Sequence, residues 1–292
     1  MIPHETEFEL YHYGESLCSQ MVRVALNEKQ IGYTSHHMHL ELTGENLSPA
    51  FKKINPNVVV PVLVHNGAPL YNSWEILRYL DNYAPQQGTK LLPQTDDGMA
   101  ALDDLVHENA LRSDVALGEN FGTSIAGAST YILANILKRR PALGVMWDYL
   151  TKHPDRMRKI AFCVLRLRGG LPKPLYEKFI RRLAQGLADN EKRMSDGRAY
   201  MFGNYSLLDV MMTAHFHRLE DVHLGTIFTS EHLPHLTAYW QRLQARPSYK
   251  PAILDFHSWE WRAAMDDIYK GQPSPFLPLL ADELGKRLAN QT

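Results

Sequence analysis

Ser16 and Cys18 are the side chains of this sequence that best combine chemical reactivity with a defined position. They lie at the junction between a predicted strand at residues 8–13 and a predicted helix at residues 19–29. The free N–H groups at a helix start favour a bound anion. A serine hydroxyl there can donate a hydrogen bond to that anion, and a cysteine there can become a reactive thiolate. The alternatives are a plain helix cap at Ser16 and a packed thiol at Cys18.

A second group of residues is suited to hold a peptide-like ligand. Pro61 directly precedes a short apolar strand at residues 62–64, and Asn72-Ser73 opens an amphipathic helix about ten residues later. This arrangement leaves a main-chain edge at Val60 and free N–H groups at the helix start. The edge can pair with a peptide backbone, and the helix start can bind a carboxylate.

The elements that position these residues alternate between strands and helices. Apolar residues at helical spacing predict buried faces, and the turn at residues 65–67 predicts a hairpin. The predicted order is βαβαββα, which is a compact α/β domain of thioredoxin type. The strands are expected at residues 8–13, 33–40, 62–64 and 70–71, and the helices at residues 19–29, 48–53 and from 72 or 73 to 83.

The remainder of the chain predicts a different architecture. We expect residues 1–84 to form the α/β domain, residues 85–94 to form a linker that begins with Pro-Gln-Gln-Gly, and residues 95–292 to be all-helical. Ser206 and Asp209 have the spacing of a helix capping box. We therefore expect an α/β thioredoxin-like N-terminal domain followed by an all-α C-terminal domain.

The composition places the chain among ordinary globular proteins. It has 292 residues, 45% hydrophobic and 22% charged, a net charge of -1 and two cysteines. No signal peptide and no apolar stretch of about 20 residues is visible. We therefore expect a cytoplasmic protein without a nucleic-acid partner.

Four features in register resemble the cytosolic glutathione transferase superfamily. A longer helical region that includes residues 166–172 is similar to the extended bacterial members, among them the β-etherases. The four features are Leu10-Tyr11-His12-Tyr13-Gly14-Glu15-Ser16-Leu17-Cys18-Ser19, Asn55-Pro56 before Val60-Pro61-Val62-Leu63, Asn72-Ser73-Trp74-Glu75, and Tyr205-Ser206-Leu207-Leu208-Asp209.

The resemblance implies glutathione as co-substrate and gives roles to the residues named above. Ser16 would donate a hydrogen bond to the glutathione thiolate, or Cys18 would form a mixed disulfide and favour reductase chemistry. Val60 would pair with the cysteinyl part of glutathione beside a cis Pro61. Ser73 would bind the γ-glutamyl carboxylate, with Asn72 where the family usually has Glu or Gln.

The implied activity is attack of the thiolate on a hydrophobic, aromatic electrophile by a detoxifying homodimer. Substrate contacts are expected from Tyr13, for which strand packing is the competing role, and from His107, Asn109 and Arg112 in the first helix after the linker. Cleavage of β-aryl ethers, and a non-catalytic association module, remain as alternative functions.

Two further patterns are expected to lack a catalytic role. His36, His37 and His39 alternate along a strand without a completing carboxylate or cysteine cluster, so no metal site is expected. Residues 138–182 hold 13 Lys/Arg and 3 Asp/Glu, a net charge of 13 − 3 = +10. A solvated basic insertion is the favoured interpretation. An anionic substrate or a membrane surface is a less favoured partner for it.

Overall fold

The computed structural model describes residues 1–111 and 114–290. Its contacts divide these residues into two compact units. Unit 1 comprises residues 1–84, 130–171 and 251–268, and unit 2 comprises residues 85–129, 172–250 and 269–292. Unit 1 thus includes residues 130–171 and 251–268, which the sequence predicts to belong to the C-terminal domain. Its first segment ends at Ala84, directly before the predicted linker. The division at residues 84 and 95 stays a prediction.

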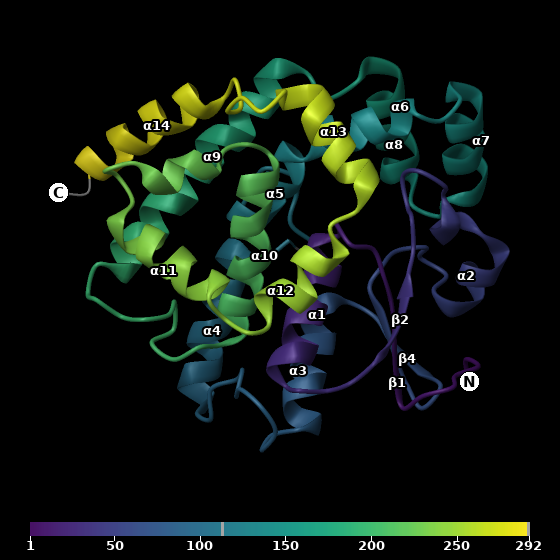
Figure 1. Ribbon diagram of the computed structural model, residues 1–292, viewed down its shortest axis with the longest axis horizontal. Coiled ribbons are helices and arrows are strands. Elements are labelled where there is room, and N and C mark those ends of the chain that lie inside the picture. Colours follow the sequence, from purple (N-terminus) through teal and green to yellow (C-terminus); the bar gives the residue numbers. More distant parts are fainter. Residues whose placement is uncertain (112–113, 291–292) are drawn as a thin grey trace. The chain divides into compact units, whose positions relative to one another are not determined.

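The first segment of unit 1 has the predicted βαβαββα order. Its mixed sheet has the strand order β2-β1-β3-β4, with β1 parallel to β2 and antiparallel to β3. α1 and α3 pack against each other on one side of the strands, and α2 lies on the other (Figure 1). The elements are β1 Phe8–His12, α1 Leu17–Glu28, β2 Thr34–His37, η1 Glu45–Leu47, α2 Pro49–Ile54, β3 Val62–His65, β4 Ala68–Leu70 and α3 Ser73–Tyr83.

The local signals in this segment explain these elements. The predicted apolar face of α1 is buried, as are Ile76, Leu77 and Leu80 of α3. Asn66 and Gly67 both have positive φ, which a two-residue turn between antiparallel strands requires. Tyr83, the last residue of α3, has an exposed ring, and its hydroxyl donates to Glu7 at 2.6 Å.

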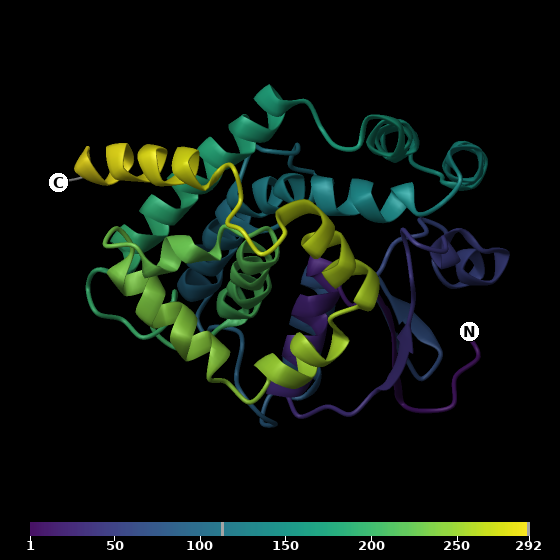
Figure 2. The ribbon, with the colours of Figure 1, turned by 45° about the horizontal axis from the view of Figure 1, so that its top comes forward.

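Three helices, of which the last two lie in the basic insertion, complete unit 1 together with a late segment of the chain. α6 Thr130–Lys138, α7 Ala142–Lys152 and α8 Arg156–Arg168 follow one another through short connections, and Figure 2 shows α7 and α8 nearly end-on. A shared apolar cluster joins them to the first segment: Leu47 and Val58 pack with Ala134, Leu137, Val145, Tyr149, Cys163 and Leu165. The late segment contributes the end of α12 Tyr249–Ala252, η3 Leu254–Phe256 and most of α13 Trp259–Tyr269.

Unit 2 is helical in the part that the structure describes. α9 packs along both α5 and α14 (Figure 1). Its elements are α4 Asp96–Asn109, α5 Phe121–Ala128, α9 Lys173–Met194, α10 Leu207–Asp221, η2 Gly225–Thr229, α11 Pro234–Gln244 and α14 Leu277–Ala289. Among the described residues, no helix has both the length and the apolar character needed to cross a membrane.

The capping box of α10 forms with altered partners. The N–H and the hydroxyl of Ser206 both donate to one carboxylate oxygen of Asp209, at 2.7 and 2.9 Å. The other oxygen accepts from the N–H of Met201 and from the hydroxyl of Tyr239. Asp209 is fully buried, so these four donors replace the water that its carboxylate loses.

Candidate functional site

Ser16 occupies the N-cap position of α1, as the sequence predicts. Its Oγ accepts a hydrogen bond from the N–H of Ser19 at 3.3 Å, and the residue is half-buried. No acceptor for the Ser16 hydroxyl hydrogen is found among the described residues. Because the oxygen serves the helix as an acceptor, the O–H bond stays available as a donor to a ligand. The helix cap and the predicted donor role are therefore compatible.

The loop that carries Ser16 is fixed by Arg23, which is fully buried on α1. The guanidinium donates to the carbonyl of Tyr13 at 3.1 Å, to that of Gly14 at 2.7 Å and to that of Ala252 at 2.6 Å. Arg23 also donates to Nδ1 of His12 at 3.0 Å. Burial, followed by the Arg23 charge, lowers the pKa of His12 to about 2, so His12 is neutral at pH 7.

Gly14 is further fixed by a hydrogen bond to His37 and by close packing against Phe256. Its N–H donates to Nε2 of His37 at 3.0 Å. A Cβ at this position would lie 2.1 Å from the carbonyl oxygen of Phe256, so only glycine fits. The neighbouring carboxylate of Glu15 accepts from the N–H of Ser258 at 2.7 Å. The loop is thus positioned before any ligand arrives.

Cys18 lies one turn into the same helix start, half-buried, and its thiol hydrogen-bonds to the hydroxyl of Ser73. Burial raises the pKa of the Cys18 thiol, and the hydrogen bond to Ser73 and the charge of Arg158 offset this rise only in part. Cys18 and Ser73, which were predicted from separate motifs, therefore meet. Arg158 is a neighbour that the sequence reasoning missed, and the basic run to which it belongs was its one signal.

The main-chain edge predicted at Val60 is present. The Val60-Pro61 peptide bond is cis, in agreement with the expectation from the resemblance. The carbonyls of Val58 and Val59 are already taken by the side-chain amides of Asn46 and Asn55, at 2.8 and 2.7 Å. Among the described residues, no hydrogen bond is found for the main chain of Val60, which leaves its N–H and C=O for a ligand.

The predicted helix start at Asn72 and Ser73 is also present. Asn72 is the N-cap of α3, its side chain accepts from the N–H of Trp74 at 3.1 Å, and Ser73 is the first helical residue. Asn72 adopts φ +66, a conformation that asparagine tolerates better than most residues. Ser73 is half-buried, so its N–H group can receive an anion.

Other predicted site residues have different surroundings. Tyr13 is only 2% exposed, which favours a packing role over contact with substrate. Asn109 is also buried, donates to the carbonyl of Leu105 and accepts from Asn190, which favours a structural role within unit 2. His107 is exposed on α4 and stays a prediction. Arg112 lies outside the described residues.

The three histidines considered for a metal site have protein partners instead. His36 contacts Glu9 and His39 contacts Glu260, each at 2.7 Å, and His37 accepts from Gly14.

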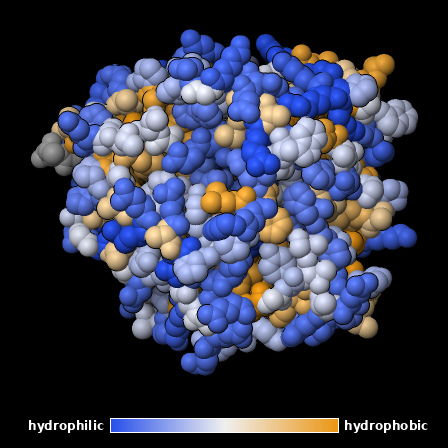
Figure 3. Space-filling model, in the orientation of Figure 1, coloured by the Kyte–Doolittle hydropathy of each residue, from blue (hydrophilic) through white to orange (hydrophobic). Residues whose placement is uncertain are grey.

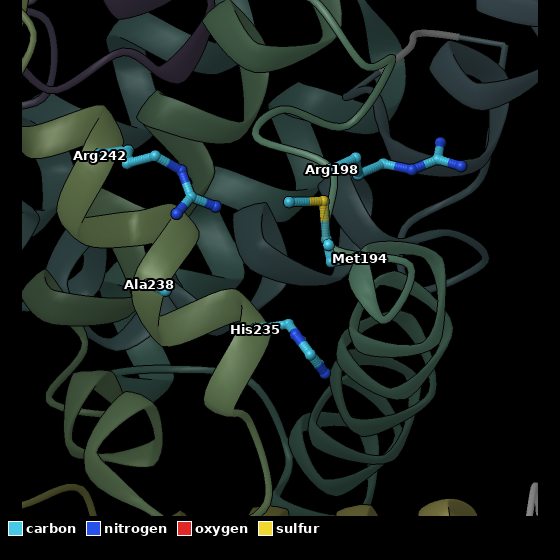
Figure 4. A pocket seen from close by; sticks show the side chains of 6 residues that line it. Met194, Arg198, His235, Ala238 and Arg242 are labelled. Atoms are coloured by element: carbon cyan, nitrogen blue, oxygen red, sulfur yellow. The ribbon is translucent and has the colours of Figure 1, made fainter.

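A separate small pocket in unit 2 includes none of the predicted residues. It is lined by Met194, Gly197, Arg198, His235, Ala238 and Arg242 (Figure 4). Arg198 is held by Asp196 at 2.6 Å, and Nε of Arg242 donates to the carbonyl of Ala199. Both side chains thus have interactions within the protein.

The mixed sheet with its cis-proline edge and the capped starts of α1 and α3 define a thioredoxin-like domain, combined in this chain with a helical region. Residues 15–82 match the family described as the N-terminal domain of glutathione S-transferase. The first segment of unit 1 is thus similar to a glutathione S-transferase N-terminal domain.

Two relatives, each matched over nearly its whole length, extend the similarity to most of this chain. Glutathione S-transferase TCHQD of Arabidopsis thaliana is 26% identical over 88% of this chain and 94% of its own length. Tetrachloro-p-hydroquinone reductive dehalogenase of Sphingobium chlorophenolicum is 26% identical over 84% of this chain and 95% of its own. The β-etherase LigF of Sphingobium sp. strain SYK-6 shares the fold, with a TM-score of 0.74 at 22% identity over 85% of this chain and 98% of LigF.

Proposed function

We propose that this protein is a glutathione transferase in which Ser16 stabilises the glutathione thiolate. The proposal rests on the hydrogen bond that Ser16 Oγ accepts from the N–H of Ser19, because the hydroxyl hydrogen of Ser16 can then be donated to sulfur. The partial positive charge at the start of α1 adds about 0.3–1 kcal/mol. The loop held by Arg23 keeps the hydroxyl in place without reorganisation during the reaction.

In this proposal glutathione binds along unit 1 through its backbone and its carboxylate. The cysteinyl part pairs with the free N–H and C=O of Val60, and the γ-glutamyl carboxylate binds at Ser73. The thiol proton leaves to solvent. The sulfur electron pair then forms a bond to an electrophilic carbon, and the leaving group departs with its own electron pair.

A hydrophobic, aromatic electrophile is the proposed second substrate. Support comes from the relative named for tetrachloro-p-hydroquinone, which is an aromatic ring bearing halogen leaving groups. β-Aryl ethers belong to the same proposal as an alternative, because the same thiolate would displace an aryloxide. A cytoplasmic homodimer is proposed as well, by analogy with the family.

Transferase chemistry is favoured over thiol-disulfide exchange by the state of Cys18. Burial raises the pKa of its thiol, and this leaves little thiolate at neutral pH. Reductase chemistry needs that thiolate as the attacking group.

The proposal is tested by Ser16→Ala with Ser48→Ala as the matched control. Ser48 caps α2 in the same manner, with its Oγ accepting from the N–H of Phe51 at 3.2 Å. Each variant loses a cap worth about 1 kcal/mol of stability. Only Ser16→Ala is expected to raise the pKa of bound glutathione, read from thiolate absorbance, and to lower kcat about 100-fold. Equal effects of the two changes would remove Ser16 from the mechanism.

A panel of halogenated aromatics and β-aryl ethers, measured with the unaltered protein, separates the substrate classes. Release of halide supports the proposed electrophile, and release of a phenol supports the etherase alternative. Glutathione binding without turnover of either class would contradict the proposed chemistry.

A further inference from the structure

α7 exposes three large apolar side chains along one stripe. Leu143, Trp147 and Leu150 are separated by four and three residues, so they share one face of the helix. Leu143 is 82% and Trp147 66% exposed. The opposite face, with Val145 and Tyr149, is buried in the cluster shared with the first segment. α7 therefore presents apolar residues on both faces, and within the described part of the chain the apolar cluster covers only the face with Val145 and Tyr149.

α8 also exposes large apolar side chains to solvent. Cys163 and Leu165 face the protein, whereas Met157, Ile160 and Leu167 are exposed, Met157 by 74%. A surface helix of a globular protein normally turns polar residues to water. The solvated basic insertion that the sequence favours thus exposes apolar side chains beside its cations on these two helices.

Cations without carboxylate partners accompany the exposed apolar residues. Arg156, Lys159 and Arg168 of α8 have no ion pair among the residues that the structure describes, and neither of the two arginines is buried. Other cations of the insertion do have partners, as Arg140 and Lys152 both contact Asp148. In Figure 3, hydrophobic and hydrophilic side chains are mixed over the upper right, where Figure 1 places α7 and α8.

We propose that this α7–α8 face, defined by Leu143, Trp147, Leu150, Met157, Ile160 and Leu167 with Arg156, Lys159 and Arg168, binds the surface of an anionic lipid bilayer. Charge complementarity favours this partner, since residues 142–168, which span α7 and α8, hold six Lys/Arg and two Asp/Glu, a net charge of 6 − 2 = +4. Each basic residue near an anionic bilayer contributes about 1 kcal/mol, and apolar side chains insert at the boundary of the acyl chains.

The distribution of the apolar residues favours lipid over a protein partner. They stand on the outward faces of two helices, and tryptophan prefers the membrane–water interface. A protein partner would need to match each side chain with a pocket, whereas a fluid bilayer adapts to all of them.

The test is flotation of the full-length protein with vesicles of phosphatidylcholine and phosphatidylglycerol in equal parts, against vesicles of phosphatidylcholine alone. We expect flotation with the anionic vesicles and a blue shift of tryptophan emission that Trp147→Phe removes. The combined change Arg156→Gln, Lys159→Gln and Arg168→Gln is expected to weaken binding about 100-fold at low ionic strength. Ile160→Ser and Leu167→Ser are expected to weaken it while leaving the charge unchanged.

A matched control removes three exposed cations from elsewhere, through Lys53→Gln, Lys90→Gln and Lys192→Gln. It alters the net charge equally and is expected to retain most of the binding. If both triple variants lost vesicle binding equally, binding would depend on net charge and not on the α7–α8 face, which would overturn the proposal. So would absence of flotation, or a concentration-dependent self-association without lipid that Ile160→Ser abolishes, which would identify the face as an interface between copies.

Discussion

The side-chain amide of Asn55 donates a hydrogen bond of 2.7 Å to the carbonyl oxygen of Val59, one residue before the free main chain of Val60. The other end of the amide accepts from the N–H of Asn57 at 3.0 Å, so Asn55 spans the whole bend. This bend presents the edge on which we propose glutathione binds.

Asn55→Ala should therefore weaken glutathione binding about tenfold, because the edge at Val60 is no longer held in one conformation. It should also lower the free energy of unfolding by about 1–3 kcal/mol, since Asn55 is buried and its partners lose their hydrogen bonds. Calorimetry with glutathione and urea unfolding give the two values. Asn57→Ala, at an exposed neighbour, is the control, and an unchanged affinity in Asn55→Ala would contradict this role.

Cys18→Ala should leave the conjugation rate within about threefold of the unaltered protein, because the thiol with its raised pKa is not the proposed nucleophile. Mass spectrometry after incubation with oxidised glutathione should find little mixed disulfide at Cys18 at neutral pH. Loss of conjugation in Cys18→Ala, together with rapid glutathionylation of the unaltered protein, would instead establish the reductase mechanism.

Arg23→Lys should keep the positive charge yet lose the planar fork that reaches the carbonyls of Tyr13 and Gly14. We expect a loss of about 2–4 kcal/mol in stability, because buried carbonyls remain without donors. At a temperature where the variant is folded, kcat should fall more than glutathione affinity, because the loop positions Ser16 and does not form the main-chain edge. A fall in affinity alone would argue against a positioning role.

Acid should destabilise the protein below pH 6.5 through two buried histidines. Burial, with a nearby arginine as the next cause, lowers the pKa of His12 to about 2 and of His215 to about 3, against 6.5 for an exposed histidine. Below pH 6.5 these two histidines become protonated in the unfolded chain but stay neutral in the folded chain. Each histidine then removes about 1.4 kcal/mol of stability per pH unit.

His215→Leu isolates one of these contributions. Neither ring nitrogen of His215 has a hydrogen-bond partner among the described residues, so leucine removes no such bond. Urea unfolding at pH 6.5 and at about pH 5 should show a smaller loss for the variant than for the unaltered protein. An identical loss would show that carboxylates dominate the acid response.

The sequence predicts those features that depend on neighbours along the chain. Caps at Ser16, Ser48 and Asn72, the hairpin turn and the alternation of strands and helices are local, and all of them are found in the structure. The domain composition depends instead on distant packing, such as that of Val58 against α6, α7 and α8. A periodic pattern shows that a helix has an apolar face but cannot show which segment will cover it.

In the candidate site, too, local features follow from the sequence and contacts between distant segments do not. The positions of Ser16, Val60 and Ser73 follow from motifs, whereas the hydrogen bond of Cys18 to Ser73 joins two motifs that the sequence leaves apart. Asn109 was assigned from its place on a helix, and its burial reflects Asn190, 81 residues away. Spacing identifies chemical groups, but it does not identify their surroundings.

Arg23 and its acceptor at Ala252 are 229 residues apart in the chain. During synthesis the loop that carries Ser16 must therefore wait until 229 further residues have been added after Arg23 before this anchor is made. Until Ala252 is available, the Arg23 guanidinium lacks one acceptor and must remain hydrated. The strand-and-helix segment that is made first therefore cannot bury Arg23. Truncated chains that end before this anchor should be bound by chaperones and cut by proteases.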